Sequence, residues 1–221
     1  PWTAFPIKGV IWYQGEANVG RPEQYGDLFP ALITDWRRQW RSDFPFYFVQ
    51  LANFMESKKI QPDSEWAALR EAQTKALKLD QVGMAVTIDI GLADDIHPKN
   101  KQEVGRRLAL VALAGSYGKN VSGSAPVFRN YRIKGDKMEL DFGQKQDGFQ
   151  IKGTTLKGFT IAGPDRVFYP AEAMVHDGKI ILSSTEVPAP LAARYGWADN
   201  PDCNLYGENG LPVAPFRTDC W

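Results

Sequence analysis

The sequence predicts an α/β protein, in which a parallel sheet covered by helices is followed by a small all-β unit. Residues 1–118 alternate short apolar runs, typical of buried strands, with segments of helical periodicity. From residue 119 the pattern changes to short strand candidates separated by turns. The 221 residues are 43% hydrophobic and 24% charged, which suits one large or two small globular domains.

The elements of the first part follow from apolar spacing and from end signals. Apolar runs predict strands at 7–13, 46–51 and 83–90. Helical spacing predicts helices at 23–40, from 64 to about 78, and at 98–115. Pro30 lies inside the first helix and predicts a kink or two abutting helices. Ser64 is suited to cap the second helix, and Pro98 to begin the third.

Residues 119–190 are interpreted as a β-rich accessory domain, since turn signals separate their apolar runs. The expected strands are 127–133, 137–142, 149–151, 159–161, 173–175 and 179–182. Residues 191–221 are rich in Pro, Gly and Asn, and we expect an irregular tail that packs back on the α/β part.

Charge and composition exclude several classes of function. Twenty-six basic and 26 acidic residues give a net charge of zero, which argues against nucleic acid as a partner. No apolar run reaches the roughly 18 residues that span a bilayer, so no membrane partner is expected. The two histidines and two cysteines lack zinc spacing, and no phosphate-binding loop is present, so neither metal nor cofactor is expected. The chain opens on Pro1 without a signal peptide, which indicates an excised piece of a longer protein.

Cys203 and Cys220 enclose a segment with little regular pattern. A disulfide between them would close a loop of about 16 residues and contribute roughly 3 kcal/mol in the loop-entropy model. We predict this bridge, with two reduced cysteines as the alternative.

His97 follows a predicted strand and precedes a predicted helix, with Asp94 and Asp95 just upstream. A histidine beside a carboxylate is suited to act as general base and acid. Asp94 is the preferred partner and Asp95 the alternative; either could instead cap the helix that follows. The second histidine, His176, lies in a hairpin-like turn and is interpreted as a turn residue.

The loop after the first predicted strand reads Gln14-Gly15-Glu16-Ala17-Asn18. Gln14 or Asn18 could donate a side-chain amide to an oxyanion, with the Gly15 N–H beside it. An ordinary turn is the alternative. Ligands of open parallel sheets bind outside the carboxyl ends of the strands, so this loop and His97 are predicted to share one active-site rim.

No serine lies in a setting typical of a hydrolase nucleophile, neither Gly-x-Ser-x-Gly nor the Gly-Asp-Ser of lipase-like esterases. The serines are Ser42, Ser57, Ser64, Ser116, Ser122, Ser124, Ser183 and Ser184.

Several long motifs resemble the sialate O-acetylesterase family of the SGNH, or GDSL-like, hydrolase superfamily. They are KGVIWYQGEAN (8–18), DLFPALITDWRRQW (27–40), WAALREAQ (66–73), DIHPKNKQEVGRRLA (95–109) and RYGWADNPDCNLYGENGLPVAPFRTD (194–219). The resemblance implies a three-layer α/β/α hydrolase domain, present here in part, with a β-rich accessory domain. The family's serine block is absent from this chain and is expected upstream of Pro1 or in a separate chain.

The resemblance also assigns roles to residues. It implies that His97 is the base and that Gln14 and Gly15 contribute to the oxyanion hole. Glu16 and Asn18 are expected to bind substrate, as are Arg70 and Gln73, which match the family's Arg-Glu-Ala-Gln motif. The superfamily's spacing favours Asp94 as the acid, while the Asp-Ile-His-Pro wording favours Asp95.

We therefore expect the histidine-bearing part of a serine-dependent carbohydrate acetylesterase that removes O-acetyl groups from sialic acids. Its expected partners are an O-acetylated sugar and the segment that carries the serine, in a secreted, periplasmic or lysosomal protein. One alternative is an acetyl-xylan or other polysaccharide acetylesterase. The other is a non-catalytic carbohydrate-binding or structural subunit.

Overall fold

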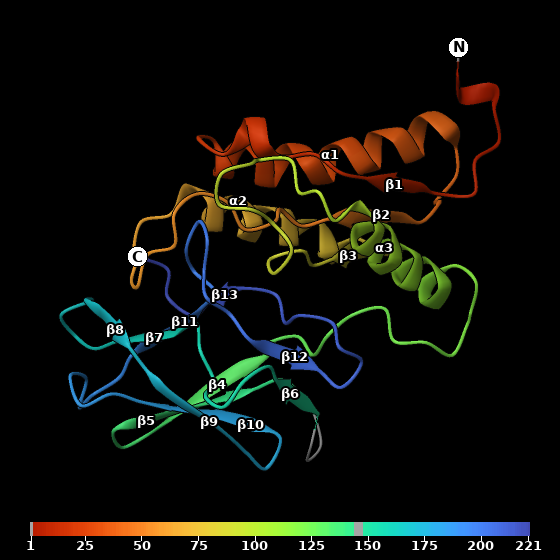
Figure 1. Ribbon diagram of the computed structural model, residues 1–221. Helices are drawn as coiled ribbons and strands as arrows, with labels where there is room; N and C mark the ends of the chain where they lie inside the picture. Colours follow the sequence, from red (N-terminus) through yellow and green to blue (C-terminus); the bar gives the residue numbers. More distant parts are fainter. Residues whose placement is uncertain (1, 144–147) are drawn as a thin grey trace.

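The computed structural model describes residues 2–143 and 148–221 and consists of an α/β part above a β-rich part (Figure 1). Its parallel sheet has the order β1 (Val10–Trp12), β2 (Phe46–Val49), β3 (Val82–Ala85). Helices α1 (Pro22–Trp40), α2 (Glu65–Thr74) and α3 (Lys101–Gly115) flank it, with short 3-10 turns η1 (Trp2–Ala4), η2 (Glu16–Asn18) and η3 (Lys75–Lys78). The predicted α/β class is confirmed.

The two faces of the parallel sheet bury separate cores. Phe46 and Phe48 of β2 point to one face, where α1 and α2 supply a cluster rich in aromatic rings. Tyr47 and Val49 point to the other face and pack against α3. Alternation along a strand puts neighbouring side chains on opposite faces, so one strand anchors all three layers.

Local capping explains where two of the helices begin. The Ser64 hydroxyl accepts the Ala67 N–H at 3.0 Å, so α2 begins where the sequence predicts. The start of α3 at Pro98 is wrong, because Asn100 is the cap and its side chain accepts the Glu103 N–H at 3.2 Å. His97 therefore lies in a loop before α3. Helix α1 is assigned as a single helix through Pro30.

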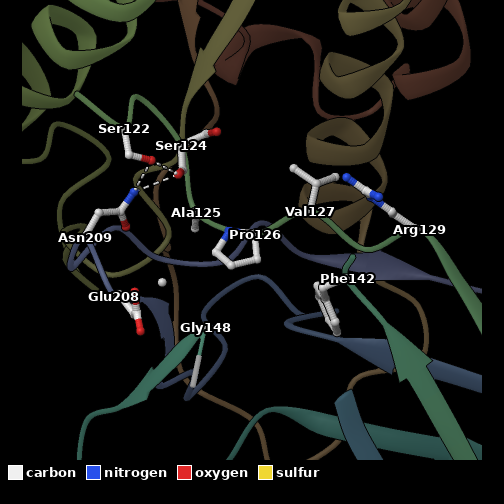
Figure 2. A pocket seen from close by; sticks show the side chains of 11 residues that line it. Ser122, Ser124, Ala125, Pro126, Val127, Arg129, Phe142, Gly148, Glu208 and Asn209 are labelled. Carbon is white, nitrogen blue, oxygen red and sulfur yellow. Dashed lines mark hydrogen bonds between the residues drawn. The ribbon is translucent and has the colours of Figure 1, made fainter. Parts of the chain in front are cut away.

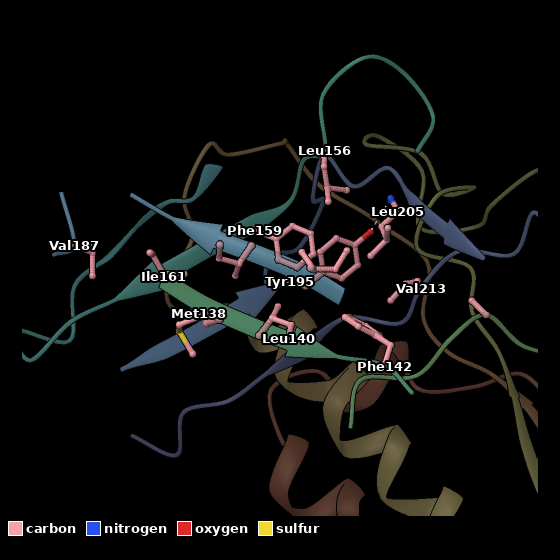
Figure 3. Packing of buried hydrophobic residues seen from close by; sticks show 14 of the residues in the cluster. Met138, Leu140, Phe142, Leu156, Phe159, Ile161, Val187, Tyr195, Leu205 and Val213 are labelled. Atoms are coloured by element: carbon pink, nitrogen blue, oxygen red, sulfur yellow. Dashed lines mark hydrogen bonds between the residues drawn. The ribbon is translucent and has the colours of Figure 1, made fainter. Parts of the chain in front are cut away.

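The second part consists of antiparallel strands. One sheet has the order β4 (Asn130–Lys134), β5 (Lys137–Asp141), β10 (Lys179–Ser183), β9 (Glu172–His176). Another has the order β13 (Phe216–Arg217), β11 (Ala192–Tyr195), β7 (Phe159–Ala162), β8 (Phe168–Pro170), and β12 (Leu205–Gly207) pairs with β6 (Phe149–Ile151). Side chains from these sheets share one core, in which Leu140, Phe159 and Tyr195 lie close together (Figure 3).

The irregular character expected for residues 191–221 is wrong, because this stretch supplies β11, β12 and β13. The same stretch also contacts the α/β part: Arg194 donates to the Pro62 carbonyl at 2.7 Å, and Arg217 forms a bidentate pair with Glu71. The predicted disulfide is wrong as well. Cys203 and Cys220 are free thiols, and the tail is held by strand pairing and ion pairs instead.

Candidate active site

The loops that follow the three parallel strands lie at the same edge of the sheet, since parallel strands end together. The loop after β1 contains Gln14 and η2, and the loop after β3 leads to His97. Lys101, at the start of α3, lies over the Tyr13 ring with its Nζ 4.8 Å from the centroid. This contact joins the end of β1 to the helix that follows His97.

The Gln14 loop is held by hydrogen bonds from the layer beneath it. The Gln14 carbonyl accepts bonds from Tyr25 Oη and Gln73 Nε2, both at 3.3 Å. Gly15 has φ +152°, and a Cβ there would lie 3.2 Å from Gln73 Nε2, so the position requires glycine. The Gln14 side-chain amide donates to Asn18 Oδ1 at 2.7 Å, which fixes the two candidate donors relative to each other.

Glu16 adds negative charge to this loop. Burial and, to a smaller extent, the nearby Glu16 carboxylate raise the pKa of Tyr13 to about 12. The Tyr13 hydroxyl is buried and has no hydrogen-bond partner within the described residues. The Tyr13 hydroxyl, directly after β1, therefore keeps its proton to high pH.

His97 lies at the surface with its side chain 86% exposed. Asp95 Oδ1 accepts the His97 backbone N–H at 2.9 Å and lies 3.5 Å from the ring Nδ1. The backbone hydrogen bond lowers the pKa of Asp95, which keeps the carboxylate charged beside the ring. Asp94 is exposed, and its side chain has no hydrogen bond or ion pair to any described residue. The geometry thus favours Asp95, the alternative partner, over Asp94.

Arg70 and Gln73 are fully buried beneath the rim rather than facing it. The Arg70 guanidinium donates to the carbonyls of Leu51, Ala52, Ala198 and Asp199 at 2.7–2.9 Å. Gln73 accepts the Leu51 N–H at 2.9 Å and donates to Gln14 and Val49 carbonyls. Burial lowers the pKa of Arg70, because the charged guanidinium is removed from water. Both side chains fix the backbone of the rim loops.

Sequence reasoning missed three polar residues beside this buried layer: the buried Asp199 and the half-buried Asn53 and Asn200. Asn53 Nδ2 donates to Asn200 Oδ1 at 2.7 Å, although 147 positions separate them. Asp199 accepts the Ser64 hydroxyl at 2.6 Å and a bond from Gln61 Nε2. No local spacing signals such pairs, because the fold alone brings them together.

The serines of the chain serve structural roles where they are bonded. In the cavity of Figure 2, Asn209 donates to the Ser122 hydroxyl at 2.8 Å and to the Ser124 carbonyl at 2.7 Å. Ser64 caps α2 and bonds Asp199. Within residues 2–143 and 148–221, no serine hydroxyl forms a hydrogen bond with His97.

The described residues contain no group of three or more His, Cys, Asp or Glu side chains arranged to hold a metal ion. In the same part of the chain, no helix has both the length and the apolar character needed to cross a membrane.

Comparison with known proteins gives concordant matches. The model of the family described as "Carbohydrate esterase, sialic acid-specific acetylesterase" matches residues 3–114. The sialate O-acetylesterases of Mus musculus and Homo sapiens are each 31% identical over 98% of this chain, which spans 45% and 46% of their lengths. A solved carbohydrate acetylesterase from Xanthomonas citri is 46% identical with a TM-score of 0.95; the match covers all of this chain and 52% of that one. The chain thus spans about half the length of these relatives.

Proposed function

Since the chain belongs to the sialic acid-specific acetylesterase family of carbohydrate esterases, we propose that it forms the histidine-bearing part of a serine-dependent carbohydrate acetylesterase. The observation that carries this proposal is the pairing of an exposed His97 with Asp95 on the rim that also bears the Gln14 loop. A purely carbohydrate-binding subunit has no need of a histidine beside a charged carboxylate.

The proposed reaction uses a serine from a segment outside this chain. His97 takes the proton of the serine hydroxyl as its oxygen attacks the acetyl carbonyl carbon. The oxyanion of the tetrahedral intermediate accepts hydrogen bonds from the Gly15 N–H and the Gln14 side-chain amide. The intermediate collapses by breaking the bond to the sugar oxygen, which receives the proton from His97.

Water completes the cycle. His97 removes a proton from the water as it attacks the acetyl-serine, and returns that proton to the serine oxygen when acetate leaves. Asp95 stabilises the protonated ring during both steps, and Asp94 is the alternative for this role. Glu16 and Asn18, on the same loop as Gln14, are proposed to contact the sugar. Arg70 and Gln73 would support binding by fixing the loops, because their side chains are buried.

For the substrate we propose O-acetylated sialic acid, supported by the matched family and by the curated relatives named sialate O-acetylesterase. An acetylated xylan or other polysaccharide is the second candidate. It is favoured by the solved Xanthomonas citri protein of 46% identity, which is named a carbohydrate acetylesterase without mention of sialic acid.

The test compares this chain alone with the protein that also carries the serine segment, using p-nitrophenyl acetate and then acetylated sialic acid and acetylated xylan. The chain alone is expected to be inactive and the longer protein active. Enzyme-like turnover by the chain alone, abolished by a serine-directed inhibitor, would overturn the assignment of the nucleophile to another segment. Preference for acetylated xylan would replace the first substrate by the second.

A further inference from the structure

We propose that Asn53 is a positioning residue for the loop that carries His97, and that Asn200 from the C-terminal segment holds Asn53 in place. The proposal deepens the function proposed above and rests on it for the role of His97. Asn53 lies in the loop after β2, the central strand of the parallel sheet, and is half-buried.

Both ends of the Asn53 side-chain amide are used. Its Oδ1 accepts the Gly91 backbone N–H at 2.7 Å, and its Nδ2 donates to Asn200 Oδ1 at 2.7 Å. Asn200 Nδ2 in turn donates to the Met55 carbonyl at 2.7 Å. One amide therefore bridges the loop before His97 and the C-terminal segment.

The approach of the two loops is very close at this point. A Cβ on Gly91 would lie 1.9 Å from the Asn53 carbonyl oxygen and 2.7 Å from its Oδ1, so no other residue fits at position 91. Two residues further along each loop, the two loops are bonded again, because the Met55 N–H donates to the Ala93 carbonyl at 3.1 Å. Met55 has φ +71°, a conformation that costs a non-glycine residue free energy and persists where the surroundings impose it.

These bonds act on the segment that leads directly to the catalytic pair. Gly91 and Ala93 are held by these hydrogen bonds. Asp95 and His97 lie two and four residues after Ala93. The His97 side chain is 86% exposed and its ring is paired with Asp95 alone among the described residues, so its neighbours orient it weakly. The anchoring of the preceding backbone is what sets the place of the ring.

The far side of Asn53 is held by further backbone and side-chain hydrogen bonds. The Phe54 N–H donates to the Asp199 carbonyl at 3.2 Å, and Arg70 holds the Ala198 and Asp199 carbonyls. Asp199 and Asn200 belong to the segment between β11 and β12 of the β-rich part. The β-rich part thus contributes directly to the geometry of the rim.

The test uses Asn53→Ala and Asn200→Ala, with Asn204→Ala as the matched control. Asn204 lies four residues after Asn200 and bonds Lys152, Thr155 and Lys157, all within the β-rich part. In the protein that carries the serine segment, Asn53→Ala is expected to lower kcat by about 100-fold with KM little changed, because a misplacement of about 1 Å costs that much. Asn200→Ala should give a smaller loss of the same kind.

A second readout does not depend on activity. The chain has two histidines, so their ring resonances are resolved by ¹H–¹³C NMR of the present chain, with His176 as an internal reference. Asn53→Ala should shift and broaden the His97 resonance and leave His176 unchanged, while Asn204→Ala should change neither. An unchanged His97 resonance in Asn53→Ala, or an equal change in Asn204→Ala, would overturn the proposal. If the longer protein proves inactive on acetyl esters, the proposed function fails, while the NMR comparison still decides whether Asn53 positions the loop.

Discussion

Two layers of polar side chains meet at the carboxyl end of the parallel sheet, and they differ most in burial. The upper layer holds His97, which is 86% exposed and paired with one carboxylate. The lower layer holds Arg70 and Gln73, which are fully buried and bonded to the backbone of several loops. A residue near the proposed reaction centre can therefore act in the reaction itself or hold the residues that do. Substitution of the first kind of residue should lower kcat, and substitution of the second kind should lower the free energy of unfolding.

The largest effect is expected for the exposed layer. In the protein that carries the serine segment, His97→Ala should lower kcat by on the order of 10⁴–10⁶-fold, because the proposed general base is lost. Stability should change by less than about 0.5 kcal/mol, since the side chain is exposed. Enzyme kinetics and urea unfolding measure the two quantities. The control is His176→Ala on β9, also exposed, which should leave both unchanged. Equal small losses from both variants would make His97 a structural residue.

The next effect separates the two acids. Asp95→Asn keeps the shape of the side chain but removes its charge beside the ring, and it should lower kcat by up to about 10⁴-fold. Asp94→Asn should change kcat little, because the side chain has no hydrogen bond or ion pair to any described residue. Steady-state kinetics at one pH suffices for the comparison. The reverse order of losses would restore Asp94 as the partner of His97.

A substitution in the buried layer should mainly lower the free energy of unfolding. Arg70→Met removes four hydrogen bonds and leaves the Leu51 and Ala198 carbonyls without a donor among the described residues, which should cost about 2–6 kcal/mol, at about 1–3 kcal/mol for each unsatisfied group. Urea unfolding measures this loss. Arg38→Met is the control, because Arg38 is 78% exposed and its pair with Asp35 contributes about 0–1 kcal/mol. Similar losses in both variants would contradict the distinction between the layers.

The layers also differ in how far the sequence predicts them. Apolar runs predict β2 and the helices because burial selects apolar residues at fixed spacing. The shared edge of the Gln14 and His97 loops follows from parallel topology. The burial of Arg70 was not predicted, because its partners are carbonyls, which every residue has.

The missed elements are short or depend on distant partners. Strand β8 has three residues and ends in Pro170, and β13 has two residues, so neither shows a periodic pattern. The sequence places the start of α3 too early, because Pro98 is suited to a first turn while Asn100 provides the cap that forms. In each case a tertiary contact or a competing cap decided the structure.

The smallest expected effect is a difference in reactivity between the two thiols. Cys203 is the less exposed of the two, and Cys220 is exposed. Burial raises the pKa of Cys203 to about 12, and its Sγ packs so closely on Gly158 that a Cβ there would lie 2.8 Å away. A raised pKa means that the neutral thiol persists to high pH, and the thiolate is the reactive form. Iodoacetamide at pH 8 should therefore label the exposed Cys220 and spare Cys203. In denaturant both should react, as counted by mass spectrometry, and a reductant should change neither count. Fast labelling of Cys203 in the native protein, or labelling that requires a reductant, would contradict a half-buried free thiol with a raised pKa.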